Sequence, residues 1–342
     1  MRLTCHFAQG LRQRLSAALL VCGLLFVQGL APSFASEALA PAVAAAHPKV
    51  SVASFNIQFL GMFQRRDNAA LADMLAPFDL VFVQELVAPP YSGKFPDGTN
   101  FRPDPEAKAF FDAMAAHGFK YVLSDEDTGT GPQQHVNSSA TEWFVAFYHP
   151  GKVAPAPDLF TGFLAADRYD NPDYERVPYA FGFRAGSEDL DFISVHLQPG
   201  GSAAETKRRA HEISTIASWI SARTGAERDY VILGDMNIED CTELTAVMPA
   251  GYASLNATCL PTNTNPNGPK PYDHVMRSVT DTSSELPYGL RVMSLVDAMR
   301  PHWDTAKGAY PGDPYKHDAF RQLYSDHNPV AFEIVIDGSD DD

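Results

Sequence analysis

Residues 229–237 read Asp-Tyr-Val-Ile-Leu-Gly-Asp-Met-Asn, an apolar run that gives way to two polar side chains, Asp235 and Asn237. The apolar part predicts a strand over residues 229–233. Side chains two positions apart on a strand point to the same side, so we expect Asp235 and Asn237 to face one site together. This stretch therefore predicts a strand that carries polar groups to the rim of a sheet.

Five other segments have the same form, in which an apolar run meets a carboxylate, amide or histidine side chain. They lie at residues 54–58, 83–85, 194–196, 272–274 and 325–330. Strands with such ends deliver their polar groups to a common rim when they are gathered into sheets. The sequence therefore predicts one site that is assembled from segments far apart in the chain.

The apolar patterns along the rest of the chain predict an α/β domain. Helices are expected at residues 66–75, 105–117 and 204–223. Strands are expected at residues 50–57, 79–84, 121–123, 143–149, 179–184, 190–196, 229–233, 274–277 and 330–336. Stretches rich in Pro and Gly predict long loops, which in compact enzymes usually surround the site, at residues 88–105, 150–178 and 261–271.

The first 35 residues have the character of a targeting segment. Three arginines precede or begin an apolar run over residues 15–30, and Ser-Phe-Ala at residues 33–35 offers a cleavage site between small residues. This order predicts a secretory signal peptide over residues 1–35, which leaves no transmembrane anchor after cleavage. Cys22 raises the alternative of a lipoprotein anchor, but it lies inside the apolar run and follows a bulky valine.

Composition sets the other boundaries. Residues 36–48 are rich in Ala and Pro and are expected to form a leader, and residues 338–342 form an acidic tail. Neither a repeat nor a charge block divides residues 49–337, so we expect one domain there. Export would make the protein periplasmic or secreted, and the sequence indicates no stable protein partner.

The chain is strongly acidic, with a formal net charge of −16 at pH 7. Such a protein has no general electrostatic attraction for a nucleic-acid backbone. Any polyanion that it handles must therefore be held by bound cations and a few local arginines. The charge argues against a tight groove binder, but it is compatible with a hydrolase that needs only transient contact.

Two cysteines, Cys241 and Cys259, remain after the expected cleavage. An even pair in an exported protein predicts a disulfide, which would contribute about 3 kcal/mol in the chain-entropy model. The alternative is a pair of unpaired buried thiols.

The carboxylates at the strand ends predict a metal site. Glu85 and Asp326 each adjoin an apolar strand, where an unpaired charge would cost several kcal/mol to bury. Together with Asn56 they offer the hard oxygen ligands that suit Mg²⁺ or Mn²⁺, and Asp235 could hold a second metal or the attacking water. The alternative for any one carboxylate is a loop cap or an ion pair with an arginine.

Two histidines at strand ends, His196 and His327, are candidates for general acid and base catalysis. A catalytic histidine is usually oriented by a carboxylate on its far nitrogen. Asp273 could orient His327, and Glu142 could orient His196. Four other histidines are interpreted as structural, namely His211, His274, His302 and His317.

Several polar groups are candidates for holding a phosphate. Asn237 has two amide donors for a phosphoryl oxygen, and Arg176 could grip phosphate bidentately. A surface ion pair with Asp173 or Glu175 explains Arg176 equally well. The basic run at residues 207–209 on the long expected helix is interpreted as a solvated face.

These residues, taken in order, resemble the endonuclease/exonuclease/phosphatase superfamily, and in particular its deoxyribonuclease I-like branch. The motifs that carry the resemblance span nearly the whole mature chain: Phe55-Asn56-Ile57-Gln58, Gln84-Glu85, His196, Gly234-Asp235-Met236-Asn237, Tyr272-Asp273 and Ser325-Asp326-His327. A cysteine soon after Gly-Asp-x-Asn and an Arg-x-Pro before a strand are also similar to that branch.

The resemblance implies a four-layer α/β sandwich, with two packed mixed sheets flanked by helices. It implies that Asn56, Glu85, Asp235 and Asp326 surround one or two Mg²⁺ ions, and that Asn237 contacts the phosphate. It also implies two histidine–carboxylate pairs, of which His327 with Asp273 is the stronger match and His196 with Glu142 the weaker.

Two positions depart from the deoxyribonuclease I-like pattern. An arginine that enters the DNA minor groove is replaced by Val87, and a tyrosine that contacts DNA is replaced by Ala140. The catalytic centre therefore matches the family, while the groups that read duplex DNA do not.

The sequence favours an exported Mg²⁺-dependent phosphodiesterase, first of all a nuclease or endonuclease that acts on extracellular nucleic acid. The alternative keeps the centre and changes the substrate to a phospholipid, sphingomyelin or a phosphomonoester. Aromatic residues of the long loops, Tyr91, Phe95 and Phe101, would serve a lipid surface or else pack locally. A third possibility, a non-catalytic binding protein, predicts decay of the centre, and the sequence retains every residue type.

Overall fold

The computed structural model describes residues 47–62, 65–136, 141–169, 171–223 and 228–338. These residues belong to one compact unit, Ala46–Asp342. The expected signal peptide, most of the leader, Ala140 and nearly all of the acidic tail lie outside the described residues. Within the described ranges, every helix is too short or too polar to cross a membrane.

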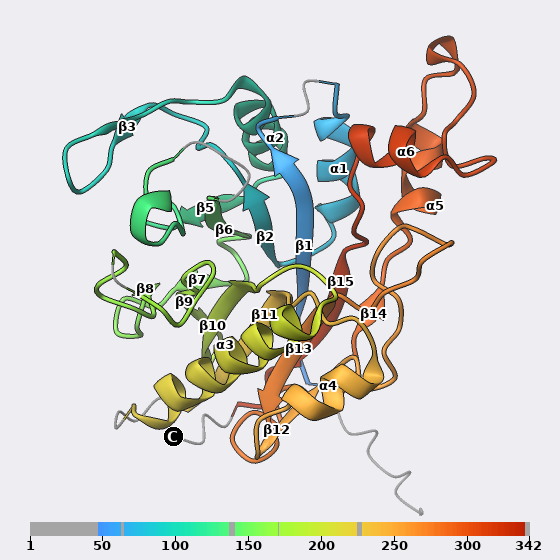
Figure 1. Ribbon diagram of the computed structural model, residues 1–342. Coiled ribbons are helices and arrows are strands. Elements are labelled where there is room, and N and C mark those ends of the chain that lie inside the picture. The colour runs from blue at the N-terminus through green and yellow to red at the C-terminus, as the bar shows by residue number, and fades with distance from the viewer. Residues whose placement is uncertain (1–46, 63–64, 137–140, 170, 224–227, 339–342) are drawn as a thin grey trace, which may run out of the picture. The chain divides into compact units, whose positions relative to one another are not determined.

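Two mixed sheets form the centre of the fold (Figure 1). The first sheet has the strand order β14-β15-β1-β2-β6-β5, and the second has the order β12-β13-β11-β10-β9-β7, with β8 paired to β9. The strands of the first sheet are β1 (Lys49–Leu60), β2 (Leu80–Leu86), β5 (Lys120–Leu123), β6 (Trp143–Tyr148), β14 (Arg291–Val292) and β15 (Val330–Val335). Those of the second are β7 (Ala154–Pro155), β8 (Gly162–Phe163), β9 (Tyr179–Ala185), β10 (Glu188–His196), β11 (Tyr230–Asp235), β12 (Tyr252–Ser254) and β13 (Asp273–Ser278).

Helices cover the outer face of each sheet. They are α1 (Asn68–Leu75), α2 (Pro105–Ala116), α3 (Ala203–Ser221), α4 (Cys241–Val247), α5 (Leu295–Met299) and α6 (His317–Leu323), with short 3-10 turns η1 (Gly131–Gln133), η2 (Arg300–His302) and η3 (Thr305–Lys307). A separate hairpin joins β3 (Gly93–Lys94) to β4 (Asn100–Phe101). Figure 1 shows α3 running along the outer face of the second sheet.

The period-two alternation of the strands sorts the core into three interfaces. On β2, Val81 and Val83 pack toward the helices α1 and α2, while Leu80 and Phe82 pack between the two sheets. On the second sheet, alternate residues of β10 and β11 face either the first sheet or the helices α3 and α4. Three apolar interfaces separate four layers, so the predicted four-layer α/β sandwich is confirmed.

The strand directions explain why polar groups meet at one rim. β1 pairs with β2 in parallel, and β10 pairs with β11 in parallel, so four strands end at the same edge. The neighbours β6, β13 and β15 are antiparallel to them and therefore begin at that edge. Residues at the end of one strand and just before the start of the next are thus brought together.

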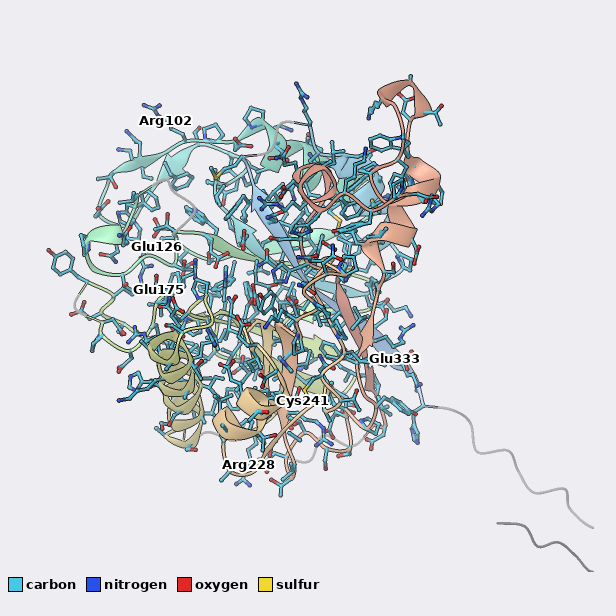
Figure 2. All side chains as sticks on the ribbon, turned by 45° about the vertical axis from the view of Figure 1, so that its right-hand side comes forward. Arg102, Glu126, Glu175, Arg228, Cys241 and Glu333 are labelled. Atoms are coloured by element: carbon cyan, nitrogen blue, oxygen red, sulfur yellow. A yellow bond between two sulfur atoms is a disulfide. The ribbon has the colours of Figure 1, made fainter. Side chains whose placement is uncertain are left out.

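The predicted elements are mostly present, and the differences are local. The expected strand over residues 79–84 is two residues longer at its end, and the loops over residues 88–105 and 150–178 contain the short strands β3, β4, β7 and β8. The predicted pairing of Cys241 with Cys259 is confirmed, because a disulfide joins them. Cys241, labelled in Figure 2, begins α4, which the sequence did not predict.

The interpretation of residues 207–209 as a solvated face is wrong for Arg209. Its side chain is fully buried and forms an ion pair with Glu243 at 2.7 Å. It also donates hydrogen bonds to the carbonyl oxygens of Gln198 and Gly200. Arg209 therefore anchors the segment that follows β10 to α3 and α4, while Lys207 is exposed as expected.

Asp191 on β10 gives a prediction about stability. It is 1% exposed, neither carboxylate oxygen has a hydrogen-bond partner among the described residues, and burial raises its pKa to about 7. The folded state thus holds a proton that the unfolded state loses near pH 4, so the folded state is destabilised as pH rises from about 4 to 7, by at most about 4 kcal/mol. We expect Asp191→Asn to raise Tm by several degrees at pH 8 and to change it little at pH 4.

Thermal unfolding followed by circular dichroism at the two pH values measures this effect. Asp112→Asn is the control, because Asp112 is an exposed partner of Lys108 on α2. An equal change in Tm at pH 4 and pH 8 for Asp191→Asn would show that ionisation of the Asp191 carboxyl does not destabilise the folded state.

Candidate active site

The ends of two parallel strand pairs, one in each sheet, supply the centre of the site. Asn56 on β1 is paired in register with Gln84 on β2, and Glu85 follows directly. His196 at the end of β10 is paired with Asp235 at the end of β11. Asn56 joins the two sheets, because its amide nitrogen donates to Glu85 Oε1 at 2.8 Å and to Asp235 Oδ2 at 2.9 Å.

The two predicted histidine–carboxylate pairs are both present. His327 Nδ1 lies 2.8 Å from Asp273 Oδ2, and His196 Nδ1 lies 2.9 Å from Glu142 Oε1. Both pairs are buried. Each carboxylate comes from the start of an antiparallel strand, which explains how residues far apart in sequence meet. Both rings are therefore fixed through one nitrogen, and the other nitrogen, Nε2, is left for chemistry.

The second nitrogens of the two histidines lie on either side of one carboxylate. Asp235 Oδ2 is 3.4 Å from His327 Nε2 and 3.6 Å from His196 Nε2. All three side chains line a cavity of about 470 Å³, together with Glu85 and Asp326. A reacting group held over Asp235 would therefore lie within reach of two imidazoles.

The charges around the histidines change their proton affinity. Burial by itself lowers the pKa of His327, but the charges of Asp273 and Asp235 outweigh it and raise the pKa well above the ordinary value. For His196, burial and Arg176 lower the pKa, while Glu142 and Asp235 outweigh them and raise it. Glu142 is also buried, yet its contact with His196 lowers its pKa. Both imidazoles thus have a higher affinity for a proton than an exposed histidine has.

Acidic groups are crowded in the same cavity. Ligand atoms of Glu85, His196 and Asp235 all lie within 4.8 Å of one another, and so do those of Asp235, Asp273 and His327. Burial, the charge of Glu142 and the charge of Asp326 each raise the pKa of Glu85, although His196 opposes them. Such a set of buried oxygen atoms can hold a hard divalent cation.

Arg176 is placed in the site, and neither surface partner considered for it is correct. Its side chain is 8% exposed, lines the cavity, and lies 3.4 Å from Glu142 Oε1 through Nε. Within the described residues, Nε and Nη1 have no hydrogen-bond partner. A buried guanidinium with unused donors is suited to bind an anionic oxygen of a substrate.

Asn237 also lines the cavity, but for a different reason from the one expected. β11 ends at Asp235, and Asn237 lies beyond it in the left-handed region, with φ 51°. Its backbone N–H donates to Asp235 Oδ1, and its amide nitrogen donates to the Leu197 carbonyl oxygen at 3.1 Å. One amide hydrogen is therefore already used, and a turn rather than strand alternation directs the side chain.

Comparisons with solved structures identify the fold. An endonuclease/exonuclease/phosphatase family protein from Leptotrichia buccalis C-1013-b matches with a TM-score of 0.52 at 12% identity, covering 83% of this chain and 99% of that chain. TDP2 from D. rerio, complexed with a single-strand DNA product, matches with a TM-score of 0.50 at 15% identity, covering 84% and 98%. Truncated TDP2 from Caenorhabditis elegans has a TM-score of 0.50 at 13% identity, covering 84% and 97%.

The chain has the DNase I-like fold, which it shares with the endonuclease/exonuclease/phosphatase family protein from Leptotrichia buccalis C-1013-b. No protein-family model matches the sequence. A search of curated proteins also finds no match. At these identities the likeness establishes the fold, so the chemistry has to be argued from the site itself.

Within this DNase I-like fold, two residues shape the end of β1 although the sequence patterns assigned them no role, and they are Gln58 and Arg66. Gln58 has φ 55° and donates from its amide nitrogen to Asp326 Oδ2 at 2.7 Å. The buried guanidinium of Arg66 donates to the carbonyl oxygens of Ile57 and Gln58 and forms an ion pair with Glu106 at 2.9 Å. The sequence feature that could have indicated a role for Arg66 is its position as a charged residue just ahead of an apolar helix.

Val87, where the deoxyribonuclease I-like pattern has an arginine, is buried and apolar in character. It lines a different cavity of about 220 Å³, which Phe95, Phe101 and Trp143 also line. Phe95 is buried, and its ring stacks near Trp143 with centroids 5.7 Å apart. Of the three loop aromatics considered for a lipid surface, Tyr91 is exposed, whereas Phe95 and Phe101 pack locally.

Proposed function

We propose that the protein is an exported, divalent-cation-dependent phosphodiesterase that acts on extracellular nucleic acid as a nuclease. The observation that carries this proposal is the pair of carboxylate-bound histidines whose free nitrogens flank Asp235. The expected signal peptide and the disulfide between Cys241 and Cys259 support export to the periplasm or the medium.

The donor set fits Mg²⁺ or Mn²⁺. Glu85, Asp235 and Asp326 offer carboxylate oxygens in one cavity, with Asn56 beside them, and hard divalent cations prefer oxygen ligands. These residues would hold the cation. When bound, it supplies positive charge that neutralises the phosphoryl oxygens of the substrate.

The chain's own residues account for the proton transfers. A phosphodiester held near Asp235 would have one histidine placed to take a proton from the attacking water and the other placed to protonate the leaving oxygen. One P–O bond forms to the water oxygen and the opposite P–O bond breaks. Asp273 and Glu142 keep each ring in the tautomer that presents Nε2, and Arg176 is available for a non-bridging oxygen.

Nucleic acid is favoured over lipid as the substrate. TDP2 from D. rerio, which shares the fold, was crystallised with a single-strand DNA product. The packing of Phe95 and Phe101 removes two of the three aromatic side chains that would have served a membrane surface. The proposal is therefore a nuclease without the duplex-reading arginine, since Val87 stands in its place.

A substrate panel tests the proposal. Purified mature protein is assayed with Mg²⁺ on single-stranded DNA, plasmid DNA, RNA, sphingomyelin vesicles and a sugar phosphate. We expect cleavage of nucleic acid, with loss of activity in EDTA and recovery when Mg²⁺ or Mn²⁺ is added. Turnover of sphingomyelin alone would replace the nuclease by a lipid phosphodiesterase, and turnover of none would reject the proposed function.

A further inference from the structure

A second cavity adjoins the catalytic cavity on the side of His327. Tyr272, Asp326 and His327 line both cavities, so the two lie side by side. The other lining residues of the second cavity are polar or small, and they are Asn263, Asn265, Gly268, Lys270 and His317. Its volume of about 190 Å³ equals roughly six water molecules at ~30 Å³ each, which is enough for a hydrated anionic group.

One positively charged side chain, that of Lys270, lies at the boundary between the two cavities. Lys270 Nζ is 2.5 Å from Glu239 Oε2, and Glu239 lines the catalytic cavity. The side chains of Lys270 and Glu239 are 36% and 21% exposed. The Lys270 backbone is fixed, because its N–H donates to Asn263 Oδ1 at 3.0 Å and its carbonyl accepts from Thr262 N–H at 2.8 Å. The ion pair and the fixed backbone therefore hold the ammonium between the two cavities.

Lys270 matters because few positively charged side chains line the two cavities. Among the described residues that line the two cavities, the Arg and Lys side chains are Arg176 and Lys270 alone. Arg176 lies beside His196 and Glu142, whereas Lys270 lines the cavity on the His327 side. A polyanionic substrate that enters this acidic protein would therefore meet the guanidinium of Arg176 at the reacting phosphate and the ammonium of Lys270 beyond it.

We propose that Lys270 binds a second phosphate of the substrate, adjacent along the chain to the phosphate that is hydrolysed, and that Glu239 holds Lys270 ready until this phosphate arrives. The inference rests on the proposed function and specifies its substrate class, which is a chain of linked phosphodiesters rather than an isolated diester. A partly exposed lysine–carboxylate pair contributes modest net stability, so a phosphate can replace Glu239 as the partner of Lys270.

The test compares two substrates at several salt concentrations with Mg²⁺ present. An oligothymidylate of ten residues carries adjoining phosphates, and bis(4-nitrophenyl) phosphate carries one. We expect Lys270→Gln to raise KM for the oligonucleotide at least about threefold and to reduce the slope of log KM against log salt by about 0.7. The change in KM for the aryl diester should be much smaller.

Glu239→Gln gives the opposite expectation, and this separates binding from a structural ion pair. Removing the carboxylate frees Lys270 and removes a negative charge, so KM for the oligonucleotide should fall. If the two variants instead raise KM alike for both substrates, the pair is structural and the inference is wrong. Lys49→Gln and Glu333→Gln are matched controls, since that pair is 2.8 Å long and half-exposed, and neither should alter either KM.

Two further outcomes distinguish this inference from the proposed function. Hydrolysis of both substrates with an unchanged oligonucleotide KM and salt slope in Lys270→Gln would overturn the inference and leave the phosphodiesterase intact. Hydrolysis of neither substrate by the wild-type protein would overturn the proposed function. In that case the slope of log Kd against log salt for oligonucleotide binding, measured by fluorescence anisotropy with Mg²⁺ for the wild-type protein and Lys270→Gln, tests the inference without turnover.

Discussion

Replacing His327 by alanine is expected to lower kcat for phosphodiester hydrolysis by about 10²–10⁴-fold, the usual contribution of one general acid or base. His196→Ala should have an effect of the same order, because its Nε2 also lies beside Asp235. The double variant should be only slightly less active than either single one, since residues that act in one step are not additive. A kcat that stays near the wild-type value after either single change would reject the mechanism.

The carboxylate partner of His327 provides a test with a defined sign. Asp273 raises the pKa of His327, so Asp273→Asn should lower that pKa and move the corresponding limb of the rate profile to lower pH. The direction is the same whether His327 acts as the acid or as the base. The wild-type profile of kcat/KM should be bell-shaped between pH 5 and 9, and a flat profile would contradict both histidine roles.

His211→Ala is the matched control for these variants. His211 Nε2 also contacts a carboxylate, Asp173, at 2.8 Å, but this pair is on the surface with side chains 51% and 41% exposed. Its replacement should leave the rate and the pH profile unchanged. A loss of rate in His211→Ala similar to that in His327→Ala would mean that folding rather than chemistry is being measured.

Removing the divalent cation is expected to abolish hydrolysis, and Glu85→Gln should raise the Mg²⁺ concentration for half-maximal rate by at least about tenfold. The physical reason is that Glu85, Asp235 and Asp326 line one cavity, where their negative charges lie close together. Among the described residues that line this cavity, Arg176 is the one Arg or Lys side chain that opposes those charges. Asp326→Asn should act in the same direction.

Binding of the cation can be measured without turnover. A ligand that binds only the folded state at 100 times its Kd stabilises that state by about 2.7 kcal/mol, so Mg²⁺ should raise Tm in a thermal-shift experiment. Glu85→Gln should reduce this rise, and Glu333→Gln, which lies further along β15 opposite Ser51 and pairs with Lys49, should not. An equal rise in Tm for the wild-type protein and Glu85→Gln would remove Glu85 from the set of cation ligands.

The sequence was informative about the strand ends because the relevant patterns are local. An apolar run followed by Glu85, His196 or Asp235 predicts a buried strand with a polar end, whatever the rest of the chain does. Such ends meet at one rim because the strand directions in the two sheets bring them there. The resemblance to the endonuclease/exonuclease/phosphatase superfamily then implied the four-layer fold and supported both histidine pairs, of which the pair with Glu142 rested on its position before a strand.

The sequence was much less informative about which charged groups are partners. Arg209 belongs to a basic run that looked solvated, but it is buried against Glu243. Arg176 contacts Glu142 rather than its sequence neighbours Asp173 and Glu175. Charge partners depend on which surfaces of distant segments come into contact, and no local pattern encodes that.

By itself, then, the sequence predicted most strands of the two sheets and the reactive residue types at their ends, and the resemblance that its motifs carry implied the fold. Only the tertiary structure decided that Asp235 lies between two imidazoles, that Arg176 faces the site and that Lys270 meets Glu239 between two neighbouring cavities. The reason is physical: period-two burial is written along the chain, whereas distances between side chains of different sheets and loops follow from three-dimensional packing.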